Sequence, residues 1–180
     1  MGILEPIISL IVFAVIIAII VAKTKNIWGK YPYTNGGKAT KEYYVRQKKK
    51  KGGVSINSAG SYRLIEYYAF ISAGDVSFRI WNDNKVLFKN NFSGPIHFDL
   101  ICELQTGEKT DAFMVMEKGS SDISFVVVED NNKFIELLKN NKNLKIVIAS
   151  MEGSELDIKY QFRMARGNFL KVYNSINNKF

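Results

Sequence analysis

The sequence contains a single cysteine, Cys102, and a single histidine, His97, among its 180 residues. One cysteine excludes an intramolecular disulfide framework and is typical of a reducing compartment. One histidine, with no second histidine and no adjacent serine or cysteine, argues against a zinc site and against nucleophilic catalysis. The glycines form neither a phosphate-binding loop nor a dinucleotide fingerprint. The sequence therefore predicts no catalytic residues, no metal ligands and no cofactor, and hence no enzyme.

These two residues have simpler structural interpretations. Phe98, Leu100 and Cys102 predict one face of a strand, opposite His97, Asp99, Ile101 and Glu103, so Cys102 is expected to be a small buried hydrophobe. His97 falls on the opposite face of the same strand and is expected to point into solvent.

Charged residues are absent from Ile7 to Ala22, and every residue of this run except Ser9 is apolar. A helix that begins at Ile3 and includes this run is about 30 Å long, which matches the hydrocarbon core of a bilayer. A cleavable signal peptide ending near Ala22 is the alternative, but the N-terminus lacks a basic region. The sequence predicts a single transmembrane anchor over residues 1–22, with apolar residues that include Ile7, Leu10, Phe13, Ile16 and Ile19.

Acidic residues are scarce between Lys23 and Lys51, where ten basic residues accompany only Glu42. Because this basic flank follows the apolar run, the C-terminal part is expected to be cytoplasmic. Glycine-rich breakers and the lack of periodicity predict a basic juxtamembrane linker over residues 23–60. The residues expected at the bilayer interface or another anionic surface are Lys23, Lys25, Trp28, Lys30, Tyr31, Lys48, Lys49, Lys50 and Lys51.

From Gly52 to Phe180 there are fifteen basic and fifteen acidic residues. Residues 61–180 are therefore expected to form a globular head with no net charge. Strand-like alternation with turns every 8 to 12 residues predicts an antiparallel β-sandwich or a flattened barrel, of which we expect the sandwich. The periodicity becomes helical at Phe134 to Leu138, with Asp130 or Asn131 as the cap, and again after Asn168. The predicted chain is thus mainly β: a transmembrane helix, a basic linker, and a sandwich with one inserted and one C-terminal helix.

The order of elements from Phe98 to Ile176 resembles a known family. The segments that carry the resemblance are Phe134-Ile135-Glu136-Leu137-Leu138-Lys139, Leu144-Lys145-Ile146-Val147-Ile148 and Tyr160-Gln161-Phe162. They are similar to the C-terminal region of the VasI-like accessory proteins of type VI secretion. The small residues usual after the final strand are replaced by Arg163-Met164-Ala165-Arg166. The resemblance implies a β-sandwich, and fold likeness alone implies no activity.

Three functions remain open at this point. The first is a non-enzymatic, single-pass membrane protein whose head docks other subunits of a membrane assembly, with Ile123 to Val128 as a strand edge for self-association. The second is a membrane protein of a lipid-containing virus, whose basic segment faces the genome or capsid proteins. The third is a sandwich that binds a lipid or small ligand among its aromatic residues. Nucleic acid, stacked on Tyr43 and Tyr44 beside the lysines, ranks last among the expected partners.

Overall fold

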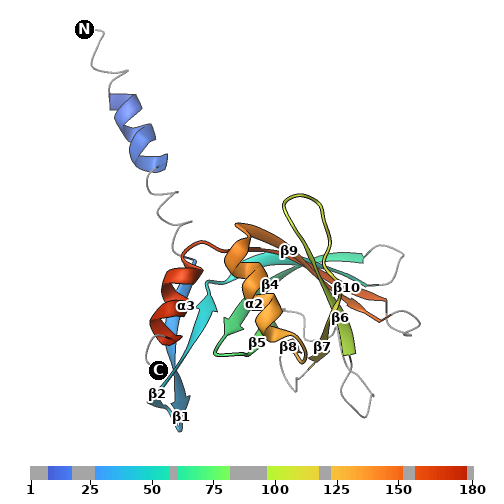
Figure 1. The fold of residues 1–180 in the computed structure, drawn as a ribbon. Coiled ribbons are helices and arrows are strands. Elements are labelled where there is room, and N and C mark those ends of the chain that lie inside the picture. The colour runs from blue at the N-terminus through green and yellow to red at the C-terminus, as the bar shows by residue number, and fades with distance from the viewer. Residues whose placement is uncertain are drawn as a thin grey trace.

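Figure 1 shows the fold as a computed structural model, which describes residues 8–17, 27–56, 61–81, 97–117, 123–151 and 157–177. One helix covers residues 8–17. The remaining elements confirm that the chain is mainly β. In chain order they are β1 (Trp28–Asn35), β2 (Lys38–Gln47), β3 (Lys50–Ile56), β4 (Ser61–Ile71), β5 (Val76–Trp81), β6 (His97–Glu103), β7 (Phe113–Glu117), β8 (Ile123–Val127), α2 (Asn131–Asn140), β9 (Asn143–Ser150), β10 (Ile158–Ala165) and α3 (Phe169–Asn177).

Eight of the ten described strands form a closed antiparallel barrel. The strand order is β1-β2-β4-β3-β10-β9-β6-β7-β8-β5, and β5 pairs with β4 as well as with β8. The strands from β4 round to β5 therefore close on themselves. This is the barrel alternative, and not the two packed sheets of the expected sandwich. Because β8 pairs with β5 and β7 along its two edges, the expected free edge at Ile123 to Val128 is also wrong.

Strands β1 and β2 form a hairpin that leaves the barrel (Figure 1). Gly36 and Gly37 join them in a two-residue turn with φ of 55° and 81°, the left-handed geometry that such hairpins require. The hairpin is joined to the barrel where Val45 pairs with Ile71 of β4. The prediction of an irregular linker over residues 23–60 is therefore wrong for 28–56, because the glycine pairs serve ordered strands and turns instead of breaking the chain.

The barrel is filled by aromatic and aliphatic side chains that alternate along each strand. Ring centroids of Phe125 lie 5.1 Å from Phe98 and 5.2 Å from Tyr160, and those of Phe78 and Phe162 lie 5.5 Å apart. All five are buried in one core. None of them lines the grooves described below, so these residues pack a core and give no support to the predicted ligand pocket.

Helix α2 closes one end of this barrel. Its buried residues Phe134, Ile135 and Leu138 belong to the core, and the ring of Phe134 meets Phe78 edge-on at 5.7 Å. The inserted helix is therefore confirmed, as is the helix that follows Asn168. The predicted cap differs in detail. Asp130 makes no capping bond, whereas Asn131 accepts a bond from the backbone N–H of Val76 and donates to the carbonyl of Val127, tying α2 to β5 and β8.

The helix at residues 8–17 has all ten residues exposed, and all but Ser9 are apolar. Ten helical residues measure about 15 Å. Within the described parts of the chain, no helix has both the length and the apolar character needed to cross a membrane. The predicted anchor begins before this helix and runs beyond it, so Ile7 and Ile19 lie outside the described residues.

Candidate functional site

The lysine tract lies where the chain enters the barrel. The backbone N–H of Lys48 donates to the carbonyl of Ile27, the first described residue after the N-terminal helix, at 2.6 Å. Lys48, Lys49 and Lys51 are exposed and Lys50 is half-buried. Since a strand hairpin returns the chain to this point, the tract is next to the entry although twenty-one positions separate Lys48 from Ile27 in the sequence. The tract thus lies beside Ile27, which follows the apolar run by five positions in the sequence.

Two further cations extend this tract around the barrel wall. Arg163 of β10 pairs with Lys145 of β9, and Lys145 pairs with Glu103 of β6. All three side chains lie on the outer face, opposite buried neighbours. The last β3–β10 pair joins Gly52 to Phe162, so Lys51 precedes this pair and Arg163 follows it by one residue. The cations come from three neighbouring strands, so the sequence alone does not bring them together without knowledge of the strand order.

The acidic residues near this basic surface are already paired. Lys145 Nζ lies 2.7 Å from Glu103 Oε2, and Lys49 Nζ lies 2.6 Å from Glu66 Oε2. The hydrogen bond from Lys145 holds the pKa of Glu103 below its ordinary range, against a smaller effect of desolvation. A groove of about 460 Å³ lies here. Its lining residues are Glu103, Leu104, Gln105, Asn143, Leu144, Lys145 and Arg163.

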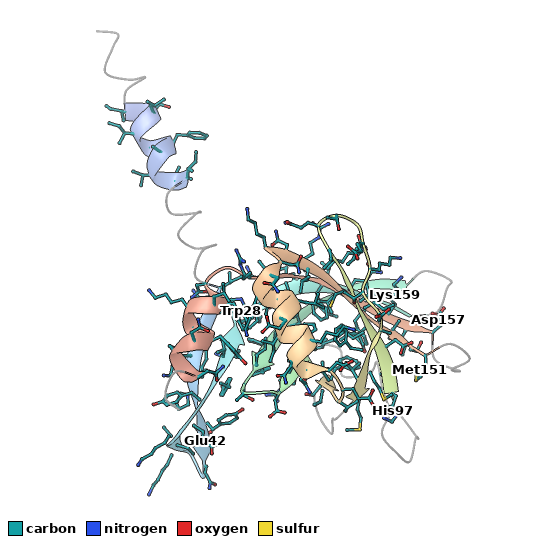
Figure 2. All side chains as sticks on the ribbon, viewed as in Figure 1. Trp28, Glu42, His97, Met151, Asp157 and Lys159 are labelled. Atoms are coloured by element: carbon teal, nitrogen blue, oxygen red, sulfur yellow. The ribbon has the colours of Figure 1, made fainter. Side chains whose placement is uncertain are left out.

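Trp28 is a core residue and not the aromatic anchor at a bilayer interface that the sequence predicts. It is 3% exposed, and its ring centroid lies 4.9 Å from that of Phe169 in α3 (Figure 2). Its indole N–H donates to the carbonyl of Ala165 at 3.0 Å. The side chain of Asn168 pairs with the backbone of Trp28, accepting from its N–H at 2.9 Å and donating to its carbonyl at 3.0 Å. Trp28 supplies both apolar contact area and an indole N–H donor to the core. Its position in the sequence, close after the apolar run, does not reveal this role.

Lys30 lies on the face of the hairpin that α3 covers. Its ammonium lies 4.1 Å from the ring centroid of Tyr43 and 3.3 Å from the carbonyl of Ser175. This face borders a groove of about 730 Å³ that Lys41, Tyr43, Ser72, Ala73 and Asn177 line together with other residues. Lys30 therefore contacts the protein itself, and the expected contact with a bilayer stays a prediction.

Tyr31 lies on the opposite face of the hairpin, in what we call the Arg46 cluster. The Arg46 guanidinium carbon lies 4.1 Å from the centroid of Tyr31 and 5.5 Å from that of Tyr68. Ring contacts of 5.1 to 6.2 Å continue through the remaining members. The cluster consists of Tyr31, Tyr33, Tyr44, Arg46, Tyr68 and Phe70, from β1, β2 and β4. Sequence reasoning singled out Tyr31 and Tyr44 but missed the arginine between the rings.

The positions of His97 and Cys102 agree with the sequence interpretation. His97 is exposed and Cys102 is fully buried. Among the described residues, no group of three or more histidine, cysteine or acidic side chains has the geometry of a metal site. Leu10, Phe13 and Ile16 are 72%, 65% and 48% exposed on the N-terminal helix. Lys23 and Lys25 lie outside the described residues.

Comparison of the chain with protein-family models, with curated proteins and with solved structures finds no match. The resemblance to the VasI-like proteins thus stays a prediction, and the function has to be argued from the surfaces described above.

Proposed function

We propose that this chain is a non-enzymatic, membrane-attached docking protein whose barrel holds other proteins near a bilayer. One observation carries the proposal: an exposed apolar helix precedes, by nine residues in the sequence, an entry point that is lined with lysines. Exposed apolar side chains on all sides of a helix are costly in water and favourable in lipid. Lysines beside such a segment add attraction to anionic headgroups.

The attachment would be short. Ten peptide units connect Ile17 to Ile27, so the two Cα atoms lie at most about 36 Å apart. Trp28 is fixed to α3 and the end of β10 by three hydrogen bonds. The barrel would therefore stay close to the surface, in contrast to the long tether expected from residues 23–60. With such a short connection, Lys48, Lys50 and Lys51 fall within reach of headgroups.

The docking part of the proposal draws on the hairpin. β1 and β2 project from the barrel and carry half-buried or exposed tyrosines on one face. Tyrosine and arginine are the residues most enriched at the energetic centres of protein interfaces. A partner held there would be kept near the membrane by the apolar segment.

The test is to extract the full-length protein from its native membrane in mild detergent and measure the mass at which it migrates. We expect resistance to alkaline carbonate washing, and a defined complex several times heavier than 20.5 kDa after the detergent contribution is subtracted. A protein removed by carbonate would sink the membrane attachment. A carbonate-resistant monomer with no bound protein would leave the attachment standing and sink the docking role.

A further inference from the structure

In the part of the chain that the structure describes, the guanidinium of Arg46 has no anionic partner. It lies between the rings of Tyr31 and Tyr68, and its Nε atom is buried and makes no hydrogen bond. Among the described residues, no carboxylate forms an ion pair or hydrogen bond with this side chain. A partly desolvated cation with unused donors is unfavourable by itself, and it attracts an anion that can accept from its planar fork.

An apolar groove adjoins the same cluster. Its volume is about 390 Å³, and it runs from Tyr33, Tyr44 and Phe70 toward Val76 and Val126. Asp75 also lines it, but its carboxylate accepts from the Ser72 hydroxyl at 3.4 Å within the β4–β5 turn. The site thus offers one cation, several ring faces and an apolar recess, in that order along the surface.

The charge around the cluster selects the kind of partner. The hairpin as a whole carries Lys30, Lys38, Lys41 and Arg46 against the single carboxylate of Glu42. Arg46 is the cation within the cluster, since Lys30 and Lys41 border the groove on the other face of the hairpin. A basic hairpin favours an acidic segment both in encounter and in the bound state. The alternative of a strand added to the outer edge of β1, the terminal strand, is less favourable, because the β1–β2 pairing is bulged between Pro32 and Thr34 and such irregular edges resist strand addition.

We propose that the Arg46 cluster binds an extended acidic segment of a partner protein, with one carboxylate on the Arg46 guanidinium and a neighbouring apolar side chain in the groove. The carboxylate accepts two parallel N–H bonds from the planar fork, and the rings of Tyr31 and Tyr68 hold that fork in position. This inference rests on the proposed docking role, whose partner it describes, but not on the membrane attachment.

The experiment uses the full-length chain in detergent micelles as bait for a phage-displayed library of random twelve-residue peptides. We expect the selected peptides to share an aspartate or glutamate beside an aromatic or aliphatic residue. Synthetic copies should bind Arg46→Gln at least tenfold more weakly than the wild type. Arg46→Lys keeps the charge but loses the planar fork, so an intermediate loss of threefold to fivefold is expected. Lys159→Gln, an exposed cation on β10, is the matched control and should bind as the wild type does.

Several outcomes would overturn the inference. One is a selection that yields no peptide or peptides without acidic residues, and another is equal binding to Arg46→Gln with its circular dichroism unchanged. Tighter, Arg46-dependent binding of phosphatidylserine vesicles or of a twelve-nucleotide oligothymidine would identify a phosphate ligand instead. Arg46→Gln should also lose the native complex. A complex that persists in this variant would contradict the inference and leave the docking role intact. A wild-type protein that migrates as a monomer would contradict the docking role itself.

Discussion

At the residue scale, burial sets the chemistry of Cys102. The thiol is fully buried, and desolvation raises its pKa from 9.0 to about 12 against a weaker opposing bond with Thr110. Tyr67 is also buried, and desolvation raises the pKa of its hydroxyl well above the ordinary 10.0. That hydroxyl donates to the carbonyl of Arg163 at 2.5 Å. Both groups are thus neutral structural members of the core at physiological pH.

We predict that the barrel loses stability as pH rises above 9. The unfolded chain releases the Cys102 proton near pH 9 while the folded chain keeps it, so the unfolded state binds fewer protons and gains in relative stability. The contribution of Cys102 to the free energy of unfolding is complete below pH 9 and is lost progressively toward pH 12. Urea unfolding should show a fall of about 1 kcal/mol between pH 9 and 10. Cys102→Ala should show a smaller fall, and an equal fall in this variant would contradict the assignment.

Gly52 is required by a close approach of two strands. A Cβ at this position would lie 2.8 Å from the carbonyl oxygen of Gln161 and 2.9 Å from Cβ of Phe162 in β10. We predict that Gly52→Ala lowers the free energy of unfolding by about 1–3 kcal/mol, since the backbone of β10 must shift. The control is Gly36→Asn, where nothing lies within 4 Å and asparagine tolerates the positive φ. Denaturant unfolding measures both variants, and equal stabilities would contradict the close approach.

At the element scale, the side chain of Asn168 makes the two hydrogen bonds to the β1 backbone that a neighbouring strand would otherwise make. It satisfies both backbone groups of Trp28 on the outer edge of β1, just before α3 begins. Pro32 further along the same edge lacks an N–H, so this edge offers little to a passing strand. The residue that the sequence marks as a helix cap therefore joins the first and last elements of the barrel domain.

We predict that Asn168→Ala destabilises the protein by about 1–3 kcal/mol, because the Trp28 N–H and carbonyl lose their partners. Hydrogen exchange should show faster exchange at the amide of Trp28 and through α3, with little change in β6 and β9. Asn168→Asp keeps the acceptor and loses only the donor, so a smaller effect is expected. Exchange that accelerates equally throughout the barrel would indicate global unfolding and contradict a local role.

Local pattern predicted the elements of this fold better than their arrangement. The alternation from Ile158 to Met164 and the helical spacing of Phe134 and Leu138 are properties of neighbours in sequence, and the structure confirms both. Barrel closure depends on β5 meeting β4 and β8, for which no local pattern exists. The hairpin is not predicted from the sequence, because Gly36 and Gly37 are interpreted there as a break between ordered segments. A glycine pair is equally compatible with a two-residue hairpin turn.

At the scale of the whole molecule, the lysine tract and the Arg46 cluster differ in position and in chemistry. The lysine tract begins beside Ile27, where the apolar segment joins the barrel, and continues to Arg163 and Lys145. The Arg46 cluster lies on the outer face of the hairpin that connects Ile27 to this tract. One chain can therefore meet an anionic surface with the first and a protein segment with the second. Only the first of these was visible in the sequence, because its lysines are consecutive.

The lysine tract gives a prediction that needs no knowledge of the partner. We expect Lys48, Lys50 and Lys51 to be acetylated several-fold more slowly in nanodiscs that contain phosphatidylserine than in neutral nanodiscs, because each lysine gains about 1 kcal/mol near an anionic surface. Salt at 0.5 M or above should remove the difference, since it shortens the screening length to about 4 Å or less. Mass spectrometry of the full-length protein measures each site. Lys109 and Lys159 are the controls and should react equally in both lipids. Equal acetylation rates at the tract in both lipids would show that the barrel does not contact the bilayer through these lysines. Another surface of the barrel would then have to face the membrane.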